Sequence, residues 1–205
     1  MTAMSGHVAT APRSGPTPRP PLTKETIFRS ALDLIDAEGM QALTMRRLAA
    51  DLGVEAASLY HHVPNKQAVL DGAVGVMRAG IVIPDPMPTT WRDIMEVVFL
   101  AYLDLLVAHP HVLPMAARHL DTDPAEGLPY LVATGLSEDD AVAVWQSVIA
   151  FVFGFATFAT GQIVGDADHL DAELASRMRH WDRDTAARAI RALLAAYDIT
   201  HLPEG

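Results

Sequence analysis

Apolar residues in the first part of the chain recur at helical spacing, in short segments that end at Gly or Pro. Residues 23–37 place Ile27, Ala31 and Ile35 on one stripe, with Gly39 in the position of a C-cap. This pattern predicts a first helix with one apolar face. That helix would support the two segments that follow it.

Two further short helical runs lie on either side of Gly53 and Val54. The first begins after Thr44, whose hydroxyl suits an N-cap, and the second covers residues 55–63 and ends before Pro64. A short helix, a Gly turn and another short helix form a helix-turn-helix pattern, whose second helix fits a DNA major groove. The apolar positions expected to hold the two helices in place are Leu48, Ala49, Leu52, Leu59 and Val63.

The rest of the chain continues as helical segments. Asn65 suits the N-cap of a fourth helix, and three prolines within residues 81–88 then mark the clearest internal boundary. Thr90 and Ser137 each open a longer helix with a capping box. We therefore expect an all-α chain, with later helices at residues 90–109, 112–120, 125–134, 137–164 and 184–198.

Composition and charge narrow the class of protein. Half of the 205 residues are hydrophobic, and there is no Cys to form disulfides or thiolate metal sites. The net charge of −10 is unusual for a DNA-binding protein, but residues 22–72 hold five basic and seven acidic residues, against eight and eighteen in residues 73–205. The acid therefore lies mainly outside the helix-turn-helix, where it interferes least with phosphate contacts.

The first 21 residues form a Pro-rich segment of low hydrophobicity. They lack the apolar stretch of a secretory signal, so we expect a disordered arm and a cytoplasmic protein. Arg13 and Arg19 in this arm either reach DNA or belong to a tail without a partner.

The segment LTMRRLAADLGV, followed after three residues by SLYHHVPNK, resembles the N-terminal DNA-binding domain of the tetracycline-repressor (TetR) family of bacterial transcription regulators. The resemblance extends upstream to Thr23 and downstream to Met77. It implies an arm at 1–21, a three-helix helix-turn-helix DNA-binding domain at 22–72, and a larger helical effector-binding and dimerisation domain at 73–205.

The resemblance also implies where the chain meets DNA. Arg46 is the best candidate for a bidentate contact with guanine or a clamp on phosphate. Tyr60 either contacts DNA or packs inside the domain, and Lys66 either reaches a phosphate or is a solvated surface residue. Ala56 and Ala57 stand where the tetracycline repressor itself has Gln or Pro, and neither Ala can make a hydrogen-bonded base contact, so the same operator sequence is not expected here. The expected DNA-binding residues are Thr44, Met45, Arg46, Ala56, Ala57, Ser58, Tyr60, His61, His62 and Lys66.

The later part of the chain resembles the C-terminal domain of the tetracycline repressor over residues 91–162. This implies a homodimer joined by helices near 137–164 and 184–198, a palindromic operator, and repression relieved by a small-molecule effector. The residues expected for a tetracycline–magnesium chelate are not recognisable, so another effector is expected. The candidate effector-binding residues are Tyr102, His109, His119, Trp145, Gln146, Phe151 and Phe155.

Two alternatives remain open from the residues alone. His109, His111 and His119 lie within eleven residues and allow a metal-responsive sensor, although Pro110 separates the first two from a shared helical face. Residues 141–164 carry no charge and are long enough to span a membrane, although Gln, Ser, Thr and Gly dilute them. No Gly-rich phosphate loop, Ser elbow or zinc-protease motif occurs, so we expect no enzyme, cofactor or resident metal.

Overall fold

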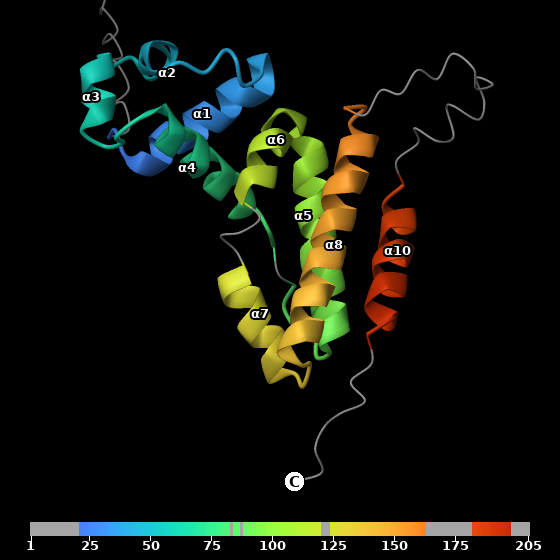
Figure 1. Ribbon diagram of the computed structural model, residues 1–205. Coiled ribbons are helices and arrows are strands. Elements are labelled where there is room, and N and C mark those ends of the chain that lie inside the picture. Colours follow the sequence, from blue (N-terminus) through green and yellow to red (C-terminus); the bar gives the residue numbers. More distant parts are fainter. Residues whose placement is uncertain (1–20, 83, 87, 120–123, 163–181, 198–205) are drawn as a thin grey trace, which may run out of the picture.

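The computed structural model describes residues 21–82, 84–86, 88–119, 124–162 and 182–197, and its regular elements there are helices, which confirms the all-α class (Figure 1). Two 3-10 segments, η1 and η2, flank the short α6. The elements are α1 (Lys24–Glu38), α2 (Met45–Leu52), α3 (Ala56–Tyr60), α4 (Lys66–Arg78), α5 (Trp91–Ala108), η1 (Pro110–Val112), α6 (Leu113–Ala116), η2 (Ala117–His119), α7 (Pro124–Ala133), α8 (Glu138–Ala159) and α10 (Arg183–Ala195).

The head of the molecule consists of α1, α2, α3 and α4. Thr23, Thr44 and Asn65 each accept a hydrogen bond from a backbone N–H three residues later. The N-caps expected for α2 and α4 are therefore confirmed, and Thr23 caps α1 in the same way. Gly53 ends α2 in the left-handed conformation, with φ of 66°. Fully buried side chains fill the space between these helices: Ile27, Ala31, Ile35, Leu43, Leu48, Leu59 and Val69.

The second helix of the helix-turn-helix is shorter than the sequence predicted. A helix over residues 55–63 was expected, whereas α3 ends at Tyr60 and a turn follows. The backbone N–H groups of His62 and Val63 both donate to the Leu59 carbonyl at 2.9 Å, which closes the chain into a tighter turn. The reason is local, because Pro64 disfavours helical geometry in the residue before it.

The body lies beyond α4. There α5 and α8 run side by side, α10 packs against both, and α7 packs against α8 (Figure 1). Two ion pairs hold α10 on α5, from Arg183 to Asp104 and from Arg191 to Glu96. Helices are found at each expected position, but α5 and α8 are shorter than expected, and α7 and α10 each begin and end earlier. The helix expected at residues 112–120 is instead divided into η1, α6 and η2, and residues 163–181 lie outside the described residues.

Helix α4 joins the two parts of the molecule. It runs through the division that we expected at residues 72 and 73, and its buried residues belong to one hydrophobic core that extends from the head into the body. The larger helices α5, α8 and α10 therefore cannot move relative to the head without affecting the packing at the end of α4.

Candidate nucleic-acid interface

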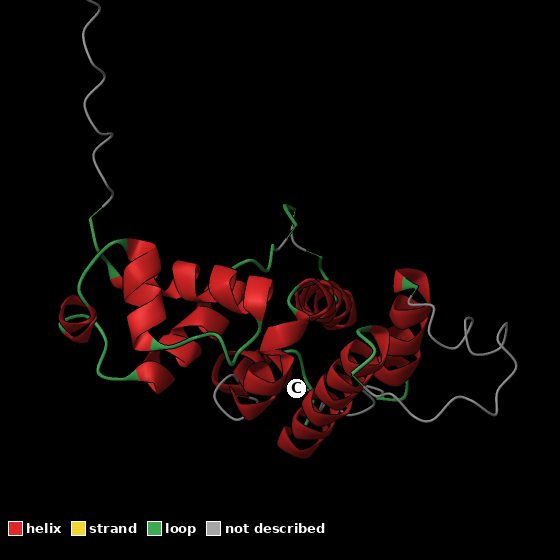
Figure 2. Ribbon diagram, turned by 90° about the horizontal axis from the view of Figure 1, so that it is seen from above, coloured by secondary structure: helices red, strands yellow, loops and turns green. Residues whose placement is uncertain are grey.

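The helix-turn-helix occupies the end of the molecule that is farthest from α10. Both α2 and α3 lie at this end in two perpendicular views (Figures 1 and 2). Only one side of each helix is needed for the core, because α2 buries Leu48 and Ala49 and α3 buries Leu59. Their other sides are free to meet a DNA groove.

Two neighbouring arginines of α2 have different surroundings. Arg47 donates to Glu38 of α1 at 2.7 Å and to Asp51 of α2 at 3.0 Å. These hydrogen bonds raise the pKa of Arg47, and the bond to Glu38 has the larger effect. It therefore clamps α2 onto α1. Arg46 is exposed and has no ion-pair partner among the described residues, so its guanidinium is available to an external anion.

Three cations of the head have no ion-pair partner in the described part of the chain, and each lies at a helix start. Lys24 is the first residue of α1, Arg46 the second of α2, and Lys66 the first of α4. The N-terminus of a helix carries partial positive charge, which adds to the charge of a cation placed there. The head thus has three positions where a phosphate is favoured.

Helix α3 presents an aromatic and polar face. Tyr60 is 53% exposed, so its ring points outward rather than into the core of the head. His61 is exposed as well, and it follows Tyr60 directly. Of the other residues that the sequence singled out, Thr44, Ala57 and Lys66 are exposed, and Met45, Ala56, Ser58 and His62 are half-buried.

This geometry agrees with what is found in known proteins. Residues 27–73 match the family model for bacterial regulatory proteins of the tetR family. An HTH-type transcriptional regulator of Saccharopolyspora erythraea is 29% identical over 195 residues, which cover 90% of this chain and 80% of the relative. Tetracycline repressor protein class E of Escherichia coli is 30% identical over 143 residues, which cover 65% of this chain and 66% of the relative. The chain belongs to the TetR family.

A solved structure extends the likeness to the body. The Streptomyces coelicolor TetR family protein ActR, in complex with (S)-DNPA, superposes with a TM-score of 0.65 at 25% identity, over 87% of this chain and all of ActR. TetR-family membership makes the chain a DNA-binding transcriptional regulator and not an enzyme.

The candidate effector-binding residues fall into separate groups. Tyr102 of α5 packs edge-on against Phe153, with ring centroids 5.8 Å apart, and burial raises the pKa of its phenol. Trp145 of α8 packs edge-on against Phe99 at 5.4 Å and covers Gly127 of α7. These two candidates therefore face the interior between α5, α7 and α8.

The remaining candidates lie elsewhere. Phe151 and Phe155 contact each other, one turn apart on α8, at 5.4 Å. Gln146 is exposed, and His109 bonds Asp36 of α1. The side chain of His119 lies outside the described residues. The effector-binding set stays a prediction.

The metal-sensor alternative depends on three histidines. The Nδ1 atoms of His109 and His111 bond Asp36 and the Ile35 carbonyl, at 2.7 and 3.0 Å. The described residues contain no group of three His, Cys or acidic side chains suited to a metal ion. Sequence reasoning missed both contacts with α1, since nothing local to residues 109–111 indicates a partner more than 70 positions away.

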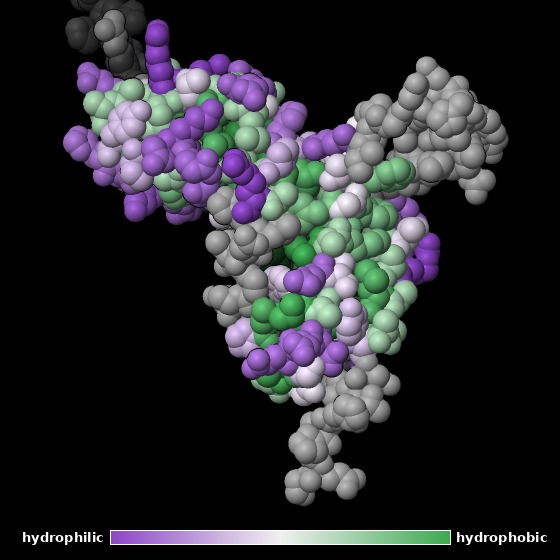
Figure 3. All heavy atoms as spheres, in the orientation of Figure 1, coloured by the Kyte–Doolittle hydropathy of each residue, from purple (hydrophilic) through white to green (hydrophobic). Residues whose placement is uncertain are grey.

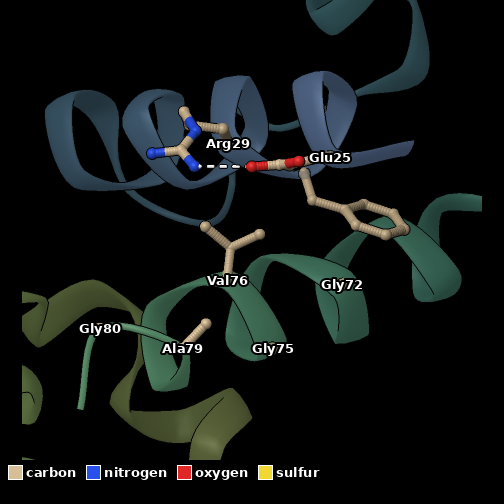
Figure 4. A pocket seen from close by; sticks show the side chains of 8 residues that line it. Glu25, Arg29, Gly72, Gly75, Val76, Ala79 and Gly80 are labelled. Carbon is tan, nitrogen blue, oxygen red and sulfur yellow. Dashed lines mark hydrogen bonds and ion pairs between the residues drawn. The ribbon is translucent and has the colours of Figure 1, made fainter. Parts of the chain in front are cut away.

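A groove also lies between α1 and α4 (Figure 4). It has a volume of about 540 Å³, and Glu25 and Arg29 form an ion pair at 3.0 Å along its α1 side. On its α4 side Gly72 lies directly beneath the ring of Phe28, with no room for a side chain. The absence of a Cβ at this position allows α1 and α4 to approach closely.

Proposed function

We propose that the chain is a ligand-responsive repressor, which binds a palindromic operator as a homodimer and is released by a small-molecule effector in the bacterial cytoplasm. The observation that carries the proposal is the combination of the exposed face of α3 with three cations at helix starts, which have no ion-pair partner among the described residues. Cations would hold the phosphates while Arg46, Ser58, Tyr60 and the two histidines meet the bases or the backbone.

A second copy of the chain would pack on the outer face of α8. This 22-residue helix is apolar enough to cross a membrane by length and composition, yet only 28% of its most apolar window is buried within the chain. Figure 3 shows mainly hydrophobic and neutral residues along it. Small exposed residues, Ala150 and Gly154, allow close helix approach, and α10 also packs against α8. The membrane alternative would use the same face, but a family of DNA-binding regulators favours a protein partner.

An effector would act by favouring one arrangement of the two heads. On a palindromic site the two α3 helices must lie about 34–36 Å apart to reach successive major grooves. An effector that binds more tightly to another arrangement would weaken operator binding. The aromatic interior near Tyr102 and Trp145 suits an organic effector, as does the likeness to ActR, which is described with a bound small molecule.

The test begins with selection of bound DNA from a random pool. Operator affinity is then measured by fluorescence anisotropy over a range of salt concentrations for wild type, Arg46→Ala and Arg47→Ala. Arg46→Ala should weaken binding by about 10- to 100-fold and reduce the salt slope by about 2, one for each head of the dimer.

Arg47→Ala is the matched control, because it removes the same charge from the adjacent residue. Its exposed ion pairs contribute little to stability, so affinity should change by less than about threefold. Equal losses for the two variants would mean that general charge, and not the placement of Arg46, drives binding. A random pool without an enriched sequence would refute the proposed function itself.

A further inference from the structure

Two histidines at the end of α5 tie the body to the head. His109 is the C-cap residue of α5, and its Nδ1 lies 2.7 Å from Oδ2 of Asp36. Asp36 is the third residue from the end of α1. The Nδ1 atom of His111 in η1 lies 3.0 Å from the carbonyl oxygen of Ile35, the residue before Asp36. Both contacts meet the last turn of α1, whereas the covalent connection between head and body runs through α4.

The position of Asp36 makes His109 important to it. A carboxylate in the last turn of a helix faces the negative end of the helix dipole, which is unfavourable. In addition, Oδ1 of Asp36 is buried without a hydrogen-bond partner among the described residues. His109 therefore supplies the donor that stabilises this carboxylate, and its removal would leave Asp36 poorly satisfied.

Hydrogen bonds continue from this contact in both directions. On the body side, Nε2 of Gln162, three residues after the end of α8, donates to the carbonyl of Pro110 at 2.6 Å. On the head side, Glu38 lies two residues after Asp36 and accepts from Arg47 of α2. A hydrogen-bonded path thus leads from the end of α8, through His109 and the end of α1, to the helix-turn-helix.

We propose that His109 and Asp36 are positioning residues that fix the orientation of the head relative to the body. The covalent connection and the apolar packing of α4 lie on one side of the head, and the polar contact at the end of α1 is a further attachment that opposes rotation of the head about α4. The inference rests on the proposed function for its effect on DNA, but the orientation itself is a property of one chain.

Distances between spin labels test the orientation directly. Because the sequence contains no Cys, Ala50→Cys in the head and Asp139→Cys in the body give two specific labelling sites, both exposed. Labelled chain is mixed with an excess of unlabelled chain, so that pulsed electron resonance reports the head-to-body distance within one chain. The variants compared are His109→Ala, the pair Asp36→Ala with His109→Ala, and Gln162→Ala. Circular dichroism confirms that each is folded.

Wild type should give one narrow distance peak, and all three variants a shifted or broader one. The paired variant leaves no carboxylate without a partner, and Gln162 is exposed, so both should remain folded even if His109→Ala alone destabilises the chain. Arg29→Gln is the control, since it breaks an exposed ion pair on α1 within the head and should leave the peak unchanged. A wild-type peak in both the paired variant and Gln162→Ala would overturn the proposal.

A second measurement connects orientation to DNA. On the sequence enriched from the random pool, the unlabelled paired variant should bind about five- to tenfold more weakly than wild type. Wild-type affinity together with a wild-type distance peak refutes the positioning role. Failure to enrich any DNA instead refutes the proposed function, while the distance measurement still decides the role of His109 and Asp36.

Discussion

Gly72 and Gly75 lie one turn apart in α4, yet an added methyl group meets different surroundings at the two positions. A Cβ at Gly72 would lie 2.3 Å from Cδ1 and 2.4 Å from Cε1 of Phe28, while a Cβ at Gly75 would meet nothing within 4 Å. Both are interior positions of a helix. The same substitution should therefore change stability in opposite directions.

The magnitudes follow from helix propensity and overpacking. Ala is favoured over Gly in a helix interior by about 1 kcal/mol, so Gly75→Ala should stabilise the protein by about that amount. Gly72→Ala gains the same term, but the Phe28 ring must move by about 1 Å to restore an ordinary contact of 3.4 Å. Overpacking of this kind costs about 1–3 kcal/mol. We expect the two variants to differ in unfolding free energy by about 1–3 kcal/mol, with Gly72→Ala the less stable.

Urea unfolding at one fixed chain concentration measures the difference, since the stability of a dimer depends on concentration. Phe28→Ala provides the internal control. With the ring removed, Gly72→Ala should stabilise the chain as much as Gly75→Ala does. If Gly72→Ala proved as stable as Gly75→Ala in the presence of Phe28, or had the same effect in both backgrounds, the close contact between α1 and α4 would not be the cause.

Two further predictions concern the body. Ala150→Glu places a charge on the outer face of α8 and should raise the dissociation constant of the dimer by about 100-fold or more, because each copy would bury an unpaired carboxylate. Sedimentation measures this constant. Ala50→Glu, at an exposed helical position of the head, is the control and should leave the dimer intact. Burial raises the pKa of Tyr102, so the unfolded chain loses this proton first, and the contribution of the phenol to stability is complete below pH of about 10 and declines as the pH rises further. Tyr102→Phe should lose less stability than wild type between about pH 9 and 11, as measured by urea unfolding. An equal loss in wild type and in Tyr102→Phe would exclude this residue as the source of the pH dependence.

Local chemistry explains what the sequence predicted well. The caps at Thr23, Thr44, Asn65 and Thr90 act within three residues, so they are visible in the sequence and are found in the structure. Helical periodicity likewise identified the buried face of α1, with Ile27, Ala31 and Ile35. The main error, the length of α3, came from extending the helix to Val63, the residue directly before Pro64.

Tertiary contacts account for what the sequence did not predict. Arg46 and Arg47 are adjacent and chemically identical. The spacing of Arg47 and Asp51, four residues apart, is visible in the sequence, but the approach of Glu38 from α1 to Arg47 is not. The sequence indicated an effector-binding or metal-binding role for His109, because it does not show the acidic partner of this residue, Asp36, which lies 73 positions away in α1. The contacts with Glu38 and Asp36 both depend on the packing of α1 against its neighbours.

The acidic composition of the chain and its DNA-binding role are compatible once these contacts are known. Within residues 22–72, Arg29 and Arg47 are neutralised by Glu25, Glu38 and Asp51, so two of the five basic residues take no part in phosphate binding. The three that remain stand at helix starts, where the helix dipole adds to their effect. Two heads then offer six cations. If each contacts one phosphate, the logarithm of the operator binding constant falls with the logarithm of the salt concentration with a slope of magnitude about 5. Binding with so few phosphate contacts must rely on base contacts and on the spacing of the two heads, which is why fixing the head at the end of α1 has a functional consequence.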